Sequence, residues 1–167
     1  MFSLFGPKTS LALYESGVKS YRKGKSQDAI EKLSEAIKKE SARSEPDKRL
    51  LSNMYCLRGE VYLSEGVALL SQSDFTYALD YNMTNESALN NMGIWFSIER
   101  FSTPDYERSF EYFDKAIAIK PGRKDIRLNK ACVKIQSGDR TGCDDLRKLD
   151  AEGYSTAKLA LEKLCKG

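Results

Sequence analysis

Residues 89–121 read LNNMGIWFSIERFSTPDYERSFEYFDKAIAIKP. The first half of this stretch places apolar and small residues at a helical spacing, at Leu89, Met92, Gly93 and Phe96. The second half repeats that spacing ahead of a proline, at Ser109, Phe113, Ala116 and Pro121. Steps of three and four residues bring side chains to one face of a helix. The stretch therefore predicts two helices joined by a turn, each with an apolar face.

The same two-helix pattern occurs three more times along the chain. Its small residue recurs at Gly17, Gly59 and Ala131, and its bulky residue at Leu33, Phe75 and Leu146. Repeats of this kind form stacked helical hairpins, since one hairpin cannot bury its apolar face alone. Each small residue is expected to receive a bulky side chain of the neighbouring helix, above all Gly59 with Phe75 and Gly93 with Phe113.

The four copies resemble the tetratricopeptide repeat (TPR) family, in the form of a small bacterial TPR protein, over roughly residues 10–165. The interval from Gly59 to Gly93 equals the family's unit of about 34 residues. The other two intervals are longer, with insertions near residues 44–51 and 98–103. The resemblance implies an all-α fold, a right-handed α-solenoid of about four helical hairpins plus a C-terminal capping helix. The expected organisation is an N-terminal segment at 1–9 and a single domain at 10–167, with repeats at 10–43, 52–85, 86–123 and 124–156 and the cap at 157–167.

Two segments carry signals for the ends of helices. Residues 102–105, Ser-Thr-Pro-Asp, predict a helix start with a hydroxyl cap, Pro104 in the first helical position and the acid Asp105 near the positive end of the helix. The triplet Gly24-Lys25-Ser26 resembles the end of a phosphate-binding loop. That loop requires a preceding strand and a glycine five positions earlier, where this chain has Lys19. We therefore interpret the triplet as a hairpin turn.

The length and composition of the chain indicate one domain with a buried core. Its 167 residues are enough for a buried core. The 27 basic and 24 acidic residues are nearly balanced, without the dense basic face that is typical of nucleic-acid binding. No stretch approaches the ~18 apolar residues of a membrane span, and the first residues lack the basic and apolar regions of a secretory signal. The sequence therefore predicts a cytoplasmic protein that binds neither nucleic acid nor a membrane.

The chain contains no histidine. This removes the commonest general base and metal ligand, together with Ser-His and Cys-His nucleophile pairs. The acidic residues fall on polar helix faces, which indicates solvated charges rather than catalytic acids. The four cysteines, Cys56, Cys132, Cys143 and Cys165, lack the C-x2-C spacing of a zinc site. We therefore expect no enzyme activity, no metal and no cofactor.

Two of the cysteines lie in the last two expected helices. Residues 138–165 resemble the closing segment of many bacterial TPR proteins, in which the last helix acts as a cap. An antiparallel cap brings Cys165 back beside Cys143. Two alternatives remain open: the pair is two small buried apolar residues, which cytosolic reduction favours, or it forms a disulfide that acts as a redox latch.

The first helices of successive hairpins line the concave wall of such a solenoid, which makes this wall an extended groove. From the first two hairpins, the expected lining residues are Leu11, Tyr14, Val18, Tyr21, Arg22, Asn53, Cys56, Glu60 and Leu63. From the last two hairpins they are Asn90, Ile94, Ser97, Ile98, Leu128, Cys132, Ile135 and Gln136. Such an apolar surface is typical of a partner site, and tyrosines combine apolar area with a polar tip.

The groove predicts a non-catalytic protein–protein interaction module, an adaptor or scaffold that binds an apolar or amphipathic segment of another protein. Some TPR proteins instead clamp the terminal carboxylate of chaperones with Lys and Asn side chains. At the matching positions this chain has Tyr14, Val18 and Leu57, and only Asn91 fits that pattern. The alternatives are a chaperone-like escort for a client protein, a contact with a second copy of the chain as a homo-oligomer, and a groove covered by the chain's own Phe2, Leu4 and Phe5.

Overall fold

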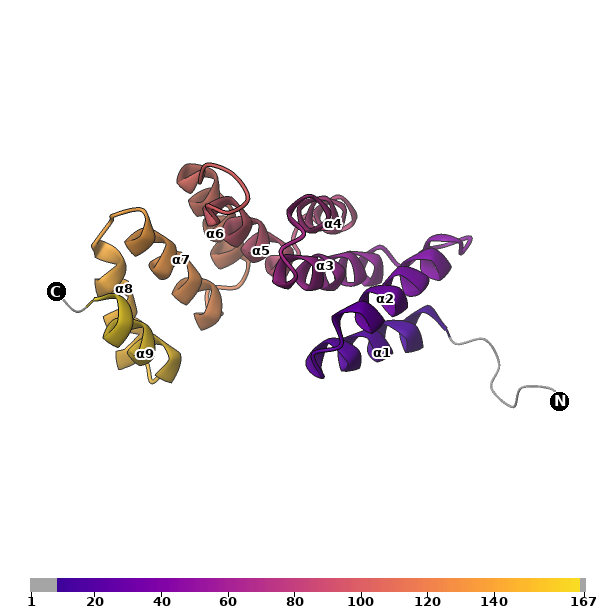
Figure 1. Cartoon of the computed structure of the whole chain (residues 1–167), viewed down its shortest axis with the longest axis horizontal. Helices are drawn as coiled ribbons and strands as arrows, with labels where there is room; N and C mark the ends of the chain where they lie inside the picture. The colour runs from indigo at the N-terminus through magenta and orange to yellow at the C-terminus, as the bar shows by residue number, and fades with distance from the viewer. Residues whose placement is uncertain (1–8, 166–167) are drawn as a thin grey trace. The chain divides into compact units, whose positions relative to one another are not determined.

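The computed structural model describes residues 9–165 and contains nine α-helices there, with no strand (Figure 1). Their bounds are α1 Ser10–Arg22, α2 Ser26–Ser41, α3 Lys48–Ser64, α4 Ala68–Tyr81, α5 Glu86–Ser97, α6 Tyr106–Ile119, α7 Lys124–Gln136, α8 Thr141–Ala151 and α9 Ser155–Leu164. The all-α prediction is confirmed. The residues predicted to cover the groove lie outside the described residues: Phe2, Leu4 and Phe5.

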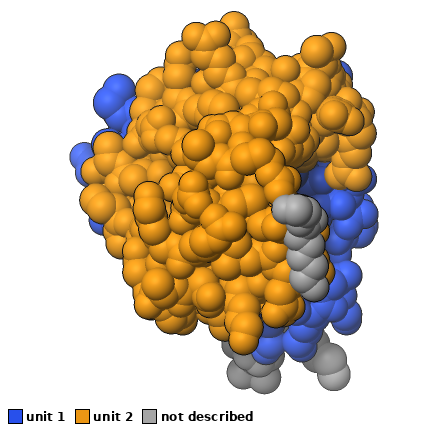
Figure 2. Space-filling view, turned by 90° about the vertical axis from the view of Figure 1, so that its left-hand side faces the viewer, with its two compact units in different colours: residues 1–88 blue, residues 89–167 orange. Residues whose placement is uncertain are grey.

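The chain divides into two compact units, residues 1–88 and residues 89–167, which Figure 2 shows in different colours. The first unit holds α1 to α4, and the second holds α6 to α9. The boundary falls within α5, directly after Ala88. The single domain at 10–167 and the handedness of the stack therefore stay predictions.

In the first unit, α1 pairs with α2 and α3 pairs with α4, and α2 also packs on α3. A Cβ on Gly59 would lie 2.6 Å from Cε1 of Phe75, and one on Gly17 would lie 2.9 Å from Cγ of Leu33. Phe75 and Leu33 are fully buried. Because a close-packed interior leaves no room for a further carbon at these points, only a glycine allows the two helices to approach this closely. The predicted contact of Gly59 with Phe75 is confirmed.

In the second unit, Gly93 of α5 lies against the ring of Phe113 of α6, where a Cβ would come within 2.9 Å of Cε1. This predicted contact is also confirmed. Oγ of Ser109 donates a hydrogen bond to the Gly93 carbonyl oxygen at 2.6 Å, which adds a polar tie between the two helices. At the end of the chain, α9 packs against α8 and α7 as a cap. Its Ala157 shares a buried cluster with Ala131, Leu146 and Leu149.

The ends of two helices show one confirmed prediction and one error. α1 ends at Arg22 and α2 begins at Ser26, so that Gly24, with a φ of 69°, lies in a hairpin turn and not in a phosphate-binding loop. α6 begins at Tyr106, and its N-cap is Asp105, whose carboxylate accepts from the amide of Arg108 at 3.0 Å. The prediction of a hydroxyl cap with Pro104 as the first helical residue is therefore wrong. A carboxylate satisfies the free amide and also lies favourably at the positive end of the helix.

Candidate functional site

The predicted groove residues lie on two pairs of helices, one pair in each unit. We call the first group the α1–α3 wall; it comprises Leu11, Tyr14, Val18, Tyr21, Arg22, Asn53, Cys56, Glu60 and Leu63. The second group, the α5–α7 wall, comprises Asn90, Ile94, Ser97, Ile98, Leu128, Cys132, Ile135 and Gln136. All of these lie on their helices except Ile98, which directly follows the last residue of α5. The two walls differ in what their side chains contact.

The α1–α3 wall combines half-buried apolar side chains with an exposed one. Tyr14, Val18 and Tyr21 are half-buried, and Leu11 is 50% exposed. Both tyrosines pack against a buried cluster that joins α2 to α3, formed by Ala29, Leu33 and Val61. Each tyrosine therefore rests on the core of the unit and keeps part of its ring accessible. The other members differ in exposure: Arg22 and Asn53 are exposed, and Glu60 and Leu63 are half-buried. Cys56 is the exception, because it is buried.

Three residues of the α1–α3 wall come together in one cluster. Sγ of Cys56 lies 3.8 Å from Oε1 of Glu60 and donates to it. Cys56 is only 4% exposed, so it offers a partner little surface. Burial, together with Cys56 and Glu60, raises the pKa of Tyr14 above its ordinary value. The Tyr14 hydroxyl therefore stays protonated at neutral pH, where it can donate a hydrogen bond.

A buried ion pair that the sequence does not reveal holds α3 against its neighbours. Nε and Nη2 of Arg58 donate to the two carboxylate oxygens of Asp74 at 2.8 Å, and Nη1 donates to Oγ of Ser34 at 2.9 Å. The three residues belong to α3, α4 and α2, so the ion pair joins the two helices of the second hairpin, and the hydrogen bond to Ser34 ties that hairpin to the first. The guanidinium also lies 5.4 and 5.9 Å from the ring centroids of Tyr55 and Tyr62. The prediction that the acidic side chains are solvated is wrong for Asp74, which is 3% exposed.

Glu40 is a second exception to that prediction. It lies near the end of α2 and is fully buried. Its carboxylate accepts from Oγ of Ser10 at the start of α1, from Nη1 of Arg43 at 2.7 Å and from the amide of Asp47 at 2.8 Å. Burial by itself raises the pKa of Glu40, but these donors outweigh it and hold the pKa below its ordinary value. One carboxylate thus connects the starts of α1 and α3, the two helices of the α1–α3 wall.

The polar side chains of the α5–α7 wall join its two helices to each other. Nδ2 of Asn129 donates to Oδ1 of Asn90 at 3.0 Å, and Nε2 of Gln136 donates to the carbonyl oxygen of Ser97 at 2.8 Å. Asn90 and Ser97 are 6% and 4% exposed. These predicted groove residues therefore stabilise the contact between α5 and α7. Asn90 and Ser97 present little surface to a partner, whereas Gln136 is exposed.

The apolar α7 residues of the α5–α7 wall pack near the chain's own last helix, and Ile94 and Ile98 are half-buried. Leu128, Cys132 and Ile135 lie against the buried cluster that includes Ala157 of α9, as does Leu161. Burial raises the pKa of the Cys132 thiol, which makes it a poor nucleophile at neutral pH. Since α9 contacts α7 directly, these three half-buried residues lie beside the chain's own last helix.

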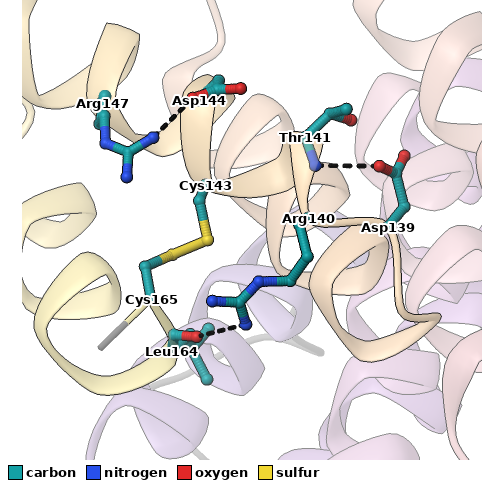
Figure 3. The surroundings of a disulfide bond; sticks show 8 residues. All are labelled: Asp139, Arg140, Thr141, Cys143, Asp144, Arg147, Leu164 and Cys165. Atoms are coloured by element: carbon teal, nitrogen blue, oxygen red, sulfur yellow. Dashed lines mark hydrogen bonds and ion pairs between the residues drawn. A yellow bond between two sulfur atoms is a disulfide. The ribbon is translucent and has the colours of Figure 1, made fainter. Parts of the chain in front are cut away.

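Cys143, in the first turn of α8, and Cys165, directly after α9, form a disulfide with their Cα atoms 5.9 Å apart (Figure 3). Of the two alternatives that the sequence leaves open, the structure has the covalent one. The bond links positions 22 residues apart and fastens the end of α9 to the start of α8. Cys56 and Cys132 do not take part in a disulfide.

Two kinds of feature are not found in residues 9–165, a cluster of metal-binding side chains and a membrane-spanning helix. Within this range, no group of three or more His, Cys, Asp or Glu side chains is arranged to hold a metal ion. No helix there is long and apolar enough to cross a membrane.

Arg58, Asp74 and Glu40 were missed by sequence reasoning, because nothing in their local pattern distinguishes them from the solvated charges around them.

Comparisons with known proteins bear on the fold. No family model and no curated protein matches the sequence, but solved structures do. MamA is 19% identical over 95% of this chain and 81% of its own, with a TM-score of 0.63. YrrB, described as a TPR protein with an unusual peptide-binding site, is 16% identical over 93% of this chain and 75% of its own, with a TM-score of 0.67. The first TPR of Spaghetti (RPAP3), bound to the HSP90 peptide SRMEEVD, is 16% identical over 78% of this chain and 94% of its own, with a TM-score of 0.63. The chain therefore has the fold of these proteins, an all-α stack of helical hairpins.

Proposed function

Because the chain has the fold of the tetratricopeptide repeat proteins, we propose that it is a non-catalytic protein–protein interaction module that acts as an adaptor or scaffold. Its α1–α3 wall binds an apolar or amphipathic segment of another protein. The observation that carries this proposal is a single row of partly exposed apolar side chains on α1, formed by Leu11, Tyr14, Val18 and Tyr21. Their spacing of three and four residues places them on one face of the helix. Partly exposed apolar rows of this kind are typical of partner sites.

The geometry of this row favours a helical partner. It extends over the eleven residues from Leu11 to Tyr21, or about 15 Å at the rise of an α-helix. An amphipathic helix that lies in a groove contacts it through side chains at the same three- and four-residue spacing. Tyr14 rests on the core and keeps a protonated hydroxyl, so it adds a hydrogen bond to the apolar contact. Two structures of the same fold are described with a peptide or a peptide-binding site, which supports a peptide as the kind of partner.

A peptide selection tests the proposal. The full chain serves as bait for a display library of random peptides about 15 residues long, a length that spans the row as a helix. We expect the enriched peptides to carry apolar residues at helical spacing. The double variant Leu11→Ser/Val18→Ser should bind them at least about 10-fold more weakly, as expected when anchor side chains are lost.

The matched control changes two other exposed leucines. Leu69 and Leu70 of α4 are 79% and 48% exposed and lie outside the α1–α3 wall. The variant Leu69→Ser/Leu70→Ser should bind the selected peptides as the wild type does. Equal binding by the wild type and a folded Leu11→Ser/Val18→Ser variant would rule out the α1–α3 wall as the site.

Cytoplasmic residence remains part of the proposal, and the disulfide makes it testable. Cytosolic reductants keep most thiols reduced, whereas oxidising compartments preserve disulfides. Alkylation of thiols in intact cells of the source, followed by mass measurement of the protein in separated fractions, reports the compartment and the state of Cys143 and Cys165 together. Recovery of the protein mainly from an extracytoplasmic fraction would contradict cytoplasmic residence.

A further inference from the structure

The disulfide between Cys143 and Cys165 adds a covalent attachment to a helix that also packs against α8 and α7. Ala157 is the buried residue of α9, while Leu159 and Leu164 are 58% and 40% exposed. The disulfide lies at the opposite end of α9 from Ala157 and joins that end to α8 (Figure 3). The bond therefore holds the end of this helix covalently, next to the packing of Ala160 and Leu161 against the buried cluster.

The two sulfur atoms differ in how a thiol from outside can reach them. Cys143 is 4% exposed and is the third residue of α8. Cys165 is half-buried and follows the last residue of α9. An attacking thiolate therefore reaches Sγ of Cys165 more readily than Sγ of Cys143. Attack at Cys165 expels the Cys143 sulfur as a thiolate.

The surroundings of Cys143 favour this thiolate as a leaving group. Residues in the first turn of a helix experience its positive end, which stabilises negative charge and lowers the pKa of a thiol. Arg140 directly precedes α8, and its Nη1 lies 3.5 Å from the carbonyl oxygen of Leu164, next to Cys165 (Figure 3). Its cationic group is therefore close to the disulfide.

The nearby carboxylates are held by other donors. Asp144 accepts from Nη1 of Arg147 at 2.5 Å, and Asp139 accepts from the amide of Thr141 at 2.9 Å (Figure 3). Arg140, by contrast, makes its contact with a carbonyl oxygen. Asp144 and Arg147 thus offset each other, whereas Arg140 and Asp139 each contact a neutral group. Of these four side chains, Arg140 contacts the residue next to Cys165 and adds positive charge beside the positive end of α8.

We propose that Cys143–Cys165 is a thiol–disulfide exchange site for a dithiol reductant, and that reduction releases α9 from α8. One thiolate of the reductant attacks Sγ of Cys165, so that a mixed disulfide forms and Cys143 leaves as a thiolate. The second thiol of the reductant then attacks the reductant's other sulfur atom, the one bonded to Cys165 in the mixed disulfide, and expels the Cys165 sulfur as a thiolate. Two electrons pass to the protein, the reductant is oxidised to a disulfide, and its two protons end on Cys143 and Cys165.

Release of α9 changes the apolar surface of the second unit. Leu161 and Ala160 of α9 pack against the same buried cluster as Leu128, Cys132 and Ile135 of α7. When the covalent tie is gone, opening of α9 uncovers these three residues of the α5–α7 wall. The exchange site therefore controls how much of this wall is accessible, and the inference does not depend on peptide binding by the α1–α3 wall.

The first test uses the full, oxidised chain under native conditions. It is equilibrated with mixtures of reduced and oxidised glutathione, and the mixed disulfide is located by peptide mass mapping after acid quenching. We expect full conversion between the two states within these mixtures, with the glutathione adduct on Cys165. A disulfide that persists in every mixture, or an adduct on Cys143, would overturn the proposal.

The second test measures the release of α9. Hydrogen exchange of the backbone amides is compared for the oxidised chain and for the chain reduced with dithiothreitol. Closing a loop of this length by a disulfide predicts that amides of α9 exchange on the order of 100-fold faster after reduction, while amides of α1 to α4 keep their rates. Unchanged rates in α9 would overturn the release of the helix.

A pair of arginine variants tests the leaving-group argument. Arg140→Gln should slow reduction by glutathione about 3- to 10-fold, because the expelled thiolate loses a nearby cation. Arg147→Gln is the matched control, since Arg147 is paired with Asp144, and it should react as the wild type does. Equal rates of reduction for the two variants would show that Arg140 does not stabilise the leaving thiolate.

Discussion

Gly59 of α3 lies so close to the ring of Phe75 of α4 that a Cβ would come within 2.6 Å of Cε1 and 2.8 Å of Cδ1. The ring is fully buried and cannot turn away into solvent. Asp74 Cβ, at 3.2 Å from the same point, closes the other side. The contact between the two helices therefore depends on the absence of a single carbon atom.

Gly59→Ala should lower the free energy of unfolding by about 1–3 kcal/mol, because the added methyl group overpacks the contact. This loss appears even though alanine favours a helix over glycine by up to about 1 kcal/mol. Gly122→Ala is the control, since a Cβ there meets nothing within 4 Å and the residue has no positive φ. Urea unfolding followed by circular dichroism compares the two variants; similar midpoints would contradict the steric explanation.

The ion pair of Arg58 and Asp74 predicts a strongly non-additive double-mutant cycle. Their side chains are 18% and 5% exposed, so Asp74→Leu leaves a largely buried guanidinium without its carboxylate. We expect a loss of about 3 kcal/mol for this variant. Arg58→Met/Asp74→Leu should recover most of that loss, since apolar replacements remove both buried charges. A double variant as unstable as the sum of the two single variants would show that the pair is not coupled.

Glu40 should contribute to acid unfolding. Its pKa in the folded chain lies below the ordinary value of 4.5, so the folded state binds the proton less readily than the unfolded state does. The stabilisation is therefore complete above about pH 4.5 and is lost as the pH falls through the lowered pKa.

Glu40→Gln should flatten the pH dependence of stability in this acidic range. Measurement of thermal unfolding from neutral pH down to about pH 3 covers the interval in which an ordinary carboxyl group titrates. Glu35→Gln serves as the control, because Glu35 is exposed and only pairs with Lys39 on the surface of α2. If both variants show the wild-type dependence on pH, Glu40 does not contribute the expected linkage.

Substitutions at Asp105 and Thr103 distinguish which of the two residues caps α6. Asp105→Ala should lower the free energy of unfolding by about 1 kcal/mol, since the amide of Arg108 loses its acceptor. Asp105→Asn should cost less, because an amide oxygen can still accept this hydrogen bond. Thr103→Ala, at a position where the sequence predicts a hydroxyl cap, should be nearly neutral. A larger effect at Thr103 than at Asp105, again by urea unfolding, would restore the sequence-based prediction.

The hairpins could be predicted because their signals are local. Gly93 and Phe113 belong to one repeat unit, and the spacing around each residue reports the helix face on which it lies. The steric match of a small residue to a bulky one then pairs the two helices. The local signals do not decide which residue caps α6. Several neighbouring residues are suitable caps, and the path of the backbone determines which of them accepts from the free amide.

The candidate site was predicted less completely. The positions on the first helices follow from the repeat, but whether a side chain there is accessible depends on the neighbouring helices. Tyr14 keeps part of its surface, whereas Asn90 is occupied by a hydrogen bond from Asn129 of α7. Likewise, Glu35 is exposed and Glu40 is buried although both belong to α2. No pattern within the helix separates them, because the donors to Glu40 come from the start of α1 and from the segment before α3.

By itself, the sequence determined the helical class of the protein, the hairpin repeat and the glycine contacts within each hairpin, because these follow from the periodicity and size of residues close together in the chain. Only the tertiary structure decided which carboxylates are buried, which of the polar wall residues bond to the neighbouring helix, and that Cys143 is bonded to Cys165. Each of these depends on where other helices place their side chains, and short-range sequence patterns do not carry that information.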